Sequence, residues 1–254
     1  SKDINDPGAI SHKVWKFDPN CKIWSRIRDM KHPRRSFGFV ACNNQLFVLG
    51  GRDNHDRIMA HVERYDAETE KWVGVRSMTE ARAGLAASEY NGCIWVAGGL
   101  IDSANIATKS VEYYNYQHDT WTQVSGMRYT LAYGVMVPVE TRLYLVGGAI
   151  GLQDSQLSGS GRQVEVWDSA NQNWALASTM SKPRHAHAAA CLRGDTPQTA
   201  YLIVLGGMST KHNSALDRVE CWRVWDNHWV PGIAQLPQPL AGHVALVLPA
   251  HVPG

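Results

Sequence analysis

The sequence predicts an all-β fold in which five small sheets of four strands form a β-propeller. Two repeated features indicate this fold. A tryptophan recurs five times, always seven residues after another aromatic residue, and four copies of the repeat contain a glycine pair after an apolar run. A period of about fifty residues is typical of an array of similar units that bury their surfaces against one another. The recurring tryptophans are Trp24, Trp72, Trp121, Trp174 and Trp229.

One copy of the repeat shows the expected order of strands. Residues 84–90 are predicted to form a first strand, and a tight Asn-Gly turn leads into the apolar second strand Cys93–Ala97. Residues 110–115 form the third strand, and Trp121 opens the fourth. We call these strands a, b, c and d. Strand c carries valine and an aromatic residue on opposite faces, so neighbouring sheets are expected to cover both sides.

The ends of the chain predict how the ring closes. The first copy begins at strand c, and the last is followed by a spare strand a at 242–248. We therefore expect one domain over 1–254, in which the two ends complete a shared fifth blade and protect its edges. A sixth blade would need a further segment. The predicted repeats are approximately 11–32, 37–80, 84–129, 134–182 and 187–238, with 242–248 as the closing strand.

Composition excludes several classes of function. The chain has 25 Lys and Arg against 23 Asp and Glu, a balance that provides no bulk positive field for nucleic acid. No apolar run approaches the roughly 20 residues of a membrane-spanning helix, so no membrane partner is expected. The five cysteines are odd in number and lack CxxC spacing, which favours free thiols in a reducing, cytoplasmic compartment.

The repeat resembles the kelch motif. The resemblance rests on the glycine pair, a Val-Glu-x-aromatic strand c, the later tryptophan, and a methionine followed by Pro-Arg, as in 30–34 and 180–184. Two copies depart from it, because Leu131 and Leu240 stand where the others have arginine. The chain resembles the substrate-binding propeller of BTB-kelch adaptors, which serve cullin-3 ubiquitin ligases.

This resemblance implies that the loops joining b to c and d to the next a form the partner-binding rim. Loops held by a rigid scaffold often carry binding residues. Because the basic residues counted on this rim, among them Arg34 and Arg184, outnumber the acidic ones, we expect an acidic protein or peptide segment as partner. The candidate partner-binding residues are Arg35, Ser36, Phe37, Arg52, Asn54, His55, Asp102, Tyr133, His185, Thr210 and Lys211.

Residues that recur at the same place in each copy are instead expected to be structural. The five tryptophans are predicted to form the core between blades. Arg34, Arg82 and Arg184 each lie four residues after a methionine, and a buttressing role tied to a strand-c glutamate (Glu63, Glu112 or Glu165) is predicted for them.

The predicted function is a non-enzymatic, protein-binding module. By resemblance it is the substrate-recognition domain of a BTB-kelch adaptor, with cullin-3 bound through BTB and BACK domains that are absent from this chain. No common catalytic motif is present, and His185 and His187, two apart on an expected strand, lack a clear third ligand, so neither a metal nor a cofactor is predicted. The alternatives are an actin-binding cytoskeletal kelch scaffold and, less favoured, a copper-dependent oxidase of the kelch-propeller type.

Overall fold

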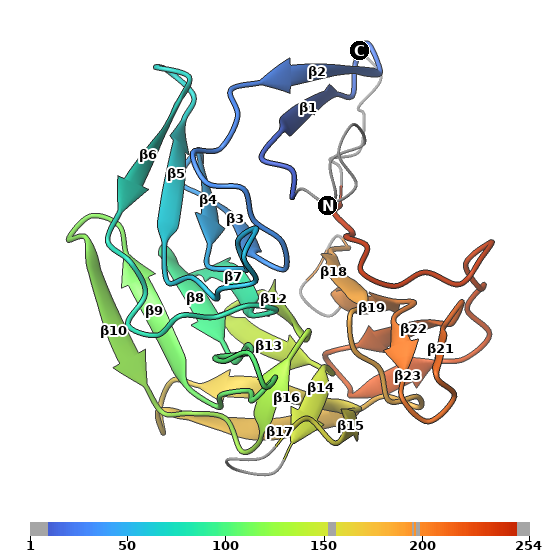
Figure 1. The fold of residues 1–254 in the computed structure, drawn as a ribbon. Coiled ribbons are helices and arrows are strands. Elements are labelled where there is room, and N and C mark those ends of the chain that lie inside the picture. Colours follow the sequence, from blue (N-terminus) through green and yellow to red (C-terminus); the bar gives the residue numbers. More distant parts are fainter. Residues whose placement is uncertain (1–9, 152–155, 195, 197–198, 248–254) are drawn as a thin grey trace.

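Four antiparallel sheets of four strands follow one another around a ring (Figure 1). The structure is a computed structural model that describes residues 10–151, 156–194, 196 and 199–247. Blade 1 consists of β3 (Gly38–Cys42), β4 (Gln45–Leu49), β5 (Val62–Asp66) and β6 (Lys71–Val75). Blade 2 consists of β7 (Ala86–Tyr90), β8 (Cys93–Ala97), β9 (Val111–Asn115) and β10 (Thr120–Val124). Blade 3 consists of β12 (Val135–Val139), β13 (Arg142–Val146), β16 (Gln163–Asp168) and β17 (Asn173–Thr179), and blade 4 of β18 (Ala188–Leu192), β19 (Tyr201–Leu205), β22 (Val219–Arg223) and β23 (His228–Val230).

The hydrophobic core lies between consecutive blades. The first strands β3, β7, β12 and β18 pack against one another in that order. Phe47 and Ile94 belong to the cluster between blades 1 and 2, and Tyr144 and Trp222 to the one between blades 3 and 4. Blades 1 to 3 thus pack against a core cluster on both faces, and the arrangement confirms the all-β propeller that the repeats predict.

The predicted closing blade is different in the structure. The hairpin of β1 (Val14–Asp18) and β2 (Ile23–Ile27) pairs with no third strand among the described residues. Residues 242–247 form no strand, Val244 is 89% exposed, and Leu248 lies outside the described residues. The prediction that residues 242–248 complete this blade is therefore wrong for the described residues. The physical reason is that strand a of blades 1–4 pairs with strand b, and the described residues supply no strand b to this blade for residues 242–247 to join.

Most of the repeated tryptophans tie one blade to the one before it. The indole nitrogen of Trp72 donates a 2.8 Å hydrogen bond to the carbonyl oxygen of Arg28, and that of Trp121 donates a 2.9 Å bond to Arg76. Trp229 donates to the Ser178 hydroxyl at 3.0 Å. Each bond crosses an interface between blades, so the tryptophans add polar links to the apolar packing.

Trp24 is the exception to the predicted core role. It is 63% exposed and contacts Phe17 within its own hairpin, with ring centroids 5.0 Å apart. The sequence pattern marks the position of this indole on its sheet, but its burial depends on a neighbouring blade. The two-stranded hairpin leaves Trp24 without such a cover.

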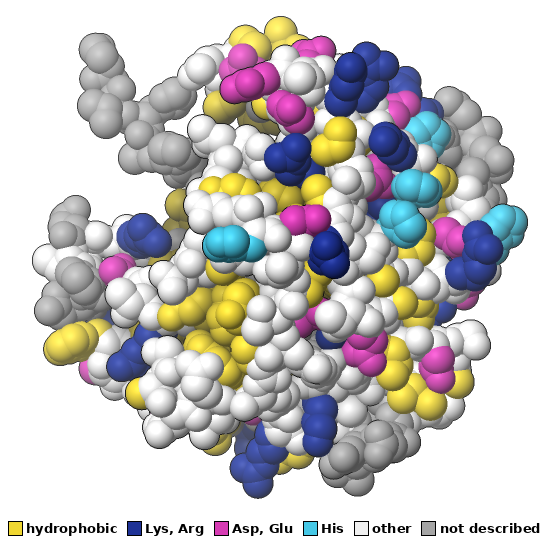
Figure 2. All heavy atoms as spheres, turned by 90° about the vertical axis from the view of Figure 1, so that its left-hand side faces the viewer, with side chains coloured by type: hydrophobic (Ala, Val, Ile, Leu, Met, Phe, Trp, Pro, Cys, Tyr) yellow, Lys and Arg dark blue, Asp and Glu magenta, His cyan; other side chains and the backbone are white. Residues whose placement is uncertain are grey.

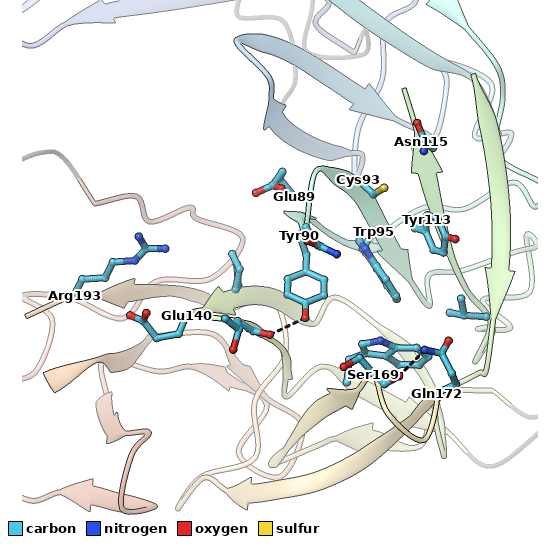
Figure 3. A pocket seen from close by; sticks show the side chains of 15 residues that line it. Glu89, Tyr90, Cys93, Trp95, Tyr113, Asn115, Glu140, Ser169, Gln172 and Arg193 are labelled. Atoms are coloured by element: carbon cyan, nitrogen blue, oxygen red, sulfur yellow. Dashed lines mark hydrogen bonds between the residues drawn. The ribbon is translucent and has the colours of Figure 1, made fainter. Parts of the chain in front are cut away.

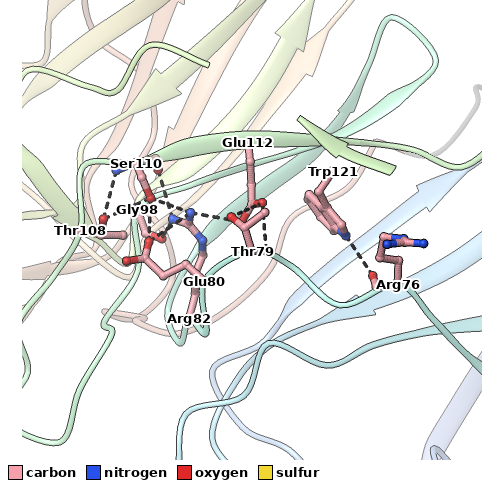
Figure 4. Close-up of polar contacts among 9 residues, drawn as sticks. All are labelled: Arg76, Thr79, Glu80, Arg82, Gly98, Thr108, Ser110, Glu112 and Trp121. Atoms are coloured by element: carbon pink, nitrogen blue, oxygen red, sulfur yellow. Dashed lines mark hydrogen bonds and ion pairs between the residues drawn. The ribbon is translucent and has the colours of Figure 1, made fainter. Parts of the chain in front are cut away.

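The recurring arginines anchor each connection between blades to the blade that follows, as Figure 4 shows for Arg82. Arg82 is fully buried, and its Nη2 atom lies 3.2 Å from a carboxylate oxygen of Glu112 in the next blade. Its Nη1 atom donates to the carbonyl oxygens of Gly98 and Ser110. Arg34 and Arg184 make the same contacts with the residues equivalent to these three. Their partners are Glu63, Gly50 and His61 for Arg34, and Glu220, Gly206 and Arg218 for Arg184.

The expected link to Glu165 is absent. Leu131 occupies the arginine position of that interface, and Arg184 pairs with Glu220 instead. Glu165 is buried with no ion pair among the described residues, and this burial raises the pKa of its carboxyl group. A buried acid without an ion-pair partner is held more easily in its neutral form.

Candidate partner-binding rim

A chain of backbone hydrogen bonds orders the loops at one rim of the ring. Five equivalent residues adopt left-handed backbone with φ between 49° and 69°, and each after the first donates its N–H to the carbonyl oxygen of the one before, at 2.7–2.8 Å. The left-handed region is costly for residues other than glycine, so its repetition shows that the loop geometry is imposed by the ring. We call this chain the relay; its members are Ser36, Gly84, Tyr133, Ala186 and Gly242.

The relay brings the two predicted sets of loops together. The residue before each of the first four relay members pairs with a residue just after a glycine pair, as Arg35 does with Arg52 and His185 with Met208. Short strands extend this pairing: β11 (Thr130–Ala132), β14 (Ala149–Gly151) and β15 (Gly159–Ser160) form one small sheet, and β20 (Met208–Ser209) and β21 (Ser214–Ala215) form another. The backbone repeats while the side chains differ, which gives a ring of similar loops with unlike surfaces.

The arginines on the blade 1 side of this rim are already paired. Arg35 and Arg52 both contact the Asp56 carboxylate, and Arg57 donates to Asp53 at 2.7 Å. Arg52 is only 5% exposed. Its guanidinium also donates to the carbonyl oxygen of Asp102, at 3.3 Å, and to the side chain of Asn105, at 3.2 Å.

The charge count behind the acidic-partner prediction therefore fails for most of its residues. Arg34 and Arg184 are fully buried in ion pairs with glutamates of the following blades. Arg35, Arg52 and Arg57 form ion pairs with Asp53 and Asp56, two aspartates of the loop after the first glycine pair. Counting charged residues along the sequence cannot show which of them form ion pairs in the folded protein.

Several other candidates have structural contacts of their own. The Asn54 side chain accepts a hydrogen bond from the backbone of Ile10, and the Asp102 carboxylate accepts one from the backbone of Ile106. Phe37 packs beside the core cluster under the hairpin, and His55 is exposed. Tyr133 lies against Gly84, where an added Cβ would come within 2.6 Å of the tyrosine ring. The absence of a side chain at Gly84 lets the tyrosine ring pack directly against the backbone of the relay.

Blades 3 and 4 meet at a polar junction on the same rim. The Ser160 hydroxyl and His185 Nδ1 are 2.9 Å apart, and the backbone N–H of Thr210 donates to the same hydroxyl at 3.0 Å. Burial lowers the pKa of His185, which favours its neutral ring. These hydrogen bonds hold the two loops together and involve none of the neighbouring cations.

Beside this junction is a groove of about 460 Å³ with basic walls. Arg162, Lys182, Lys211 and His212 line it and are exposed, and no Asp or Glu is among its described lining residues. None of these cations has an ion pair within the part of the chain that the structure describes. By contrast, basic and acidic side chains lie interspersed on the side of the ring shown in Figure 2.

Sequence reasoning found only part of this groove. Lys211 and the adjacent Thr210 were predicted, but Arg162, Lys182 and His212 were not. One signal was available: Lys182 occupies the position of Glu80 in an earlier copy, so the charge differs between copies of one loop. Three separate segments build the groove, and their proximity follows only from the fold.

Neither the histidines nor any other described residues form a metal centre. In the described part of the chain, no three His, Cys, Asp or Glu side chains are placed to hold a metal ion. His187 is buried, and its pKa is lowered to about 3, mainly by burial. The expectation that His185 and His187 share a strand was wrong, because β18 begins at Ala188 and the left-handed Ala186 turns the chain between them. Nor do the described residues contain a helix with the length and apolarity needed to cross a membrane.

Comparison with known proteins agrees with this architecture. The family model described as the Kelch motif matches residues 33–79 and 81–128. The chain thus contains kelch motifs. Alpha-scruin of Limulus polyphemus is 29% identical over 232 residues, which are 90% of this chain and 24% of that protein. Kelch-like protein 36 of Bos taurus is 23% identical over 243 residues, or 96% of this chain and 38% of that protein.

These relatives are much longer than the kelch-repeat chain. It spans about a quarter of alpha-scruin and less than two fifths of kelch-like protein 36. Among solved structures, that of YjhT has a TM-score of 0.77 at 17% identity and covers 92% of this chain and 81% of its own. At this identity the likeness shows the propeller fold alone.

Proposed function

We propose that the kelch-repeat chain is a non-enzymatic recognition module that binds a segment of another protein at the rim carrying the relay. The proposal is supported by the loops of this rim, whose backbone conformation repeats around the ring while their side chains differ. The positions equivalent to Ser36 hold Gly84, Tyr133, Ala186 and Gly242, so most of the loops differ in chemistry at this place. Asymmetric loops on a rigid scaffold suit the recognition of one extended partner.

The basic groove beside Lys211 carries the proposal about the partner. A groove of about 460 Å³ is within the usual range for binding sites. Its cations have no carboxylate of their own among the described residues, whereas the arginines near Asp56 are compensated. Charge-assisted hydrogen bonds to carboxylates are among the stronger polar contacts at a surface. The partner segment is therefore acidic, with Asp or Glu side chains in the groove.

Removing these charges is expected to weaken binding without unfolding the ring. In the variant Arg162→Ala/Lys182→Ala/Lys211→Ala, the affinity for a fluorescent peptide rich in Asp and Glu should fall at least about tenfold, or about 1.4 kcal/mol. Its melting temperature should hardly change, because all three side chains are exposed. Fluorescence anisotropy measures the affinity, and added salt should weaken it further.

Three controls make this test specific. Arg193→Ala changes a cation on the opposite rim and should leave affinity unchanged. Arg35→Ala should have a small effect, since Asp56 already neutralises this arginine. The same peptide with Asn and Gln in place of its acids should bind poorly, and a phosphoserine version shows whether phosphate is preferred to carboxylate. Equal affinity of the triple variant and the unmodified protein would contradict the acidic-partner proposal.

The wider role proposed for the module is substrate recognition in the cytoplasm for a cullin-3 ubiquitin ligase. The support is the similarity to kelch-like proteins, and the BTB and BACK domains of such adaptors would make the cullin contact. Copurification of cullin-3 with the full-length protein tests this role. Cosedimentation of the propeller with actin filaments tests the cytoskeletal alternative.

A further inference from the structure

Three of the four interfaces along the described ring share two polar fastenings. One is the buried arginine–glutamate pair, and the other is the tryptophan indole that donates across the interface. Both are present between the β1–β2 hairpin and blade 1, between blades 1 and 2, and between blades 3 and 4. The interface between blades 2 and 3 has neither.

At this interface the arginine is replaced but the glutamate is kept. Leu131 takes the place of the guanidinium, and Glu165 stays buried. A cavity of about 10 Å³, lined by Leu131, Gly147 and Glu165 among others, lies beside the carboxyl group. Gly147 is equivalent to Gly50, Gly98 and Gly206, whose carbonyl oxygens each accept a hydrogen bond from an arginine. The interface thus contains acceptors without the donor that joins the blades elsewhere.

The tryptophan fastening is missing from the same interface. The indole nitrogen of Trp174 is buried and has no hydrogen-bond acceptor among the described residues. An unsatisfied buried donor destabilises the closed interface relative to a satisfied one.

A large groove also opens between these two blades, at the rim opposite the relay (Figure 3). Its volume is about 650 Å³, and the rings of Trp95, Tyr113 and Trp167 form part of its wall. Two contacts still cross the interface there: the Tyr90 hydroxyl donates to the carbonyl oxygen of Thr141 at 2.7 Å, and the Trp95 and Trp167 rings are 5.2 Å apart.

We propose that, among the interfaces between blades 1 to 4, the one between blades 2 and 3 is the seam that opens first. Three independent features coincide there: a carboxyl group without its arginine, an indole without its acceptor, and a groove in the packing. Local opening follows the least stabilised contacts of a structure, so it is concentrated at this seam. Opening would part Gly84 from Tyr133 and so break the relay at the partner-binding rim.

Native cysteines provide a probe for each interface. Cys42 packs in the core between blades 1 and 2, Cys93 between blades 2 and 3, and Cys191 between blades 3 and 4. Cys93 and Cys191 are both half-buried, and burial raises the pKa of both thiols. Because Cys93 also lines the groove between blades 2 and 3, the change of its labelling rate on substitution, more than the rate itself, reports the opening of this interface.

The test is native-state thiol labelling of a Cys21→Ser protein, with each rate divided by that of the same site in urea-unfolded protein. Cys93 should react about tenfold faster than Cys191, the factor for a difference of about 1.4 kcal/mol in opening. Leu131→Arg, which supplies the missing cation, and Glu165→Gln, which replaces the buried carboxyl group by an amide, should each slow Cys93 and leave Cys191 unchanged. If Leu131→Arg does not fold, the nearly isosteric Glu165→Gln is the decisive variant.

Arg184→Leu is the matched control, because it reproduces the Leu131 situation between blades 3 and 4. It should accelerate labelling of Cys191 and not of Cys93. The proposal is overturned if the relative rates of Cys93 and Cys191 agree within about twofold. It is also overturned if Glu165→Gln leaves the Cys93 rate unchanged.

Discussion

Arg82→Leu is expected to lower the free energy of unfolding by about 3–5 kcal/mol, the usual effect of removing one partner from a buried ion pair. Arg82 and Glu112 are both fully inaccessible to solvent, and the carbonyl oxygens of Gly98 and Ser110 also accept hydrogen bonds from this guanidinium. Leucine is the informative replacement, since the chain itself has leucine at the equivalent position 131. Urea denaturation followed by tryptophan fluorescence measures the change.

The double variant Arg82→Leu/Glu112→Leu is the control for this prediction. It removes both charges, so a large part of the loss should be recovered. A double variant as unstable as the single one would show that the damage comes from packing. A single variant that loses less than about 1 kcal/mol would show that Glu112 finds other compensation, for which Thr79 is the nearest donor.

Trp72→Ala should be comparably destabilising, by about 3–5 kcal/mol, because it deletes a large buried side chain. Trp72 is 3% exposed and packs against Tyr65 with ring centroids 5.1 Å apart. The substitution also removes the hydrogen bond from its indole nitrogen to Arg28. Thermal unfolding monitored by circular dichroism gives the change in melting temperature.

Trp24→Ala is the matched control, since it removes the same side chain from the equivalent position of the hairpin. Trp24 is mostly exposed, so the loss should stay below about 1 kcal/mol. Equal destabilisation by the two variants would mean that the hairpin indole is buried in solution, as a complete closing blade would require.

Sequence predicted most of the blade structure because each strand has strong signals at both ends. The strand Cys93–Ala97 is found as predicted, since an Asn-Gly turn precedes it and a glycine pair follows it. The same periodicity could not predict the exposure of Trp24, because burial depends on a strand that the hairpin lacks. It also assigned Glu165 as a possible arginine partner, although the equivalent copy has Leu131.

The binding rim was less predictable for a related reason. The loops were placed together correctly, because topology alone sends the b–c and d–a connections to one edge. Their charges were not, because Asp56 neutralises Arg35 across 21 residues of sequence. The basic groove needs Arg162, Lys182 and Lys211 from three segments, and no single segment has an unusual charge.

Site-specific photo-crosslinking tests most directly the claim that the partner lies in the basic groove. A benzophenone amino acid is placed at position 211 in one protein and at position 193 on the opposite rim in another. We predict that an acidic peptide crosslinks at position 211, that an excess of unlabelled peptide prevents this, and that position 193 gives no specific product. Specific crosslinking at position 193 without any at position 211 would contradict the assignment of the binding rim.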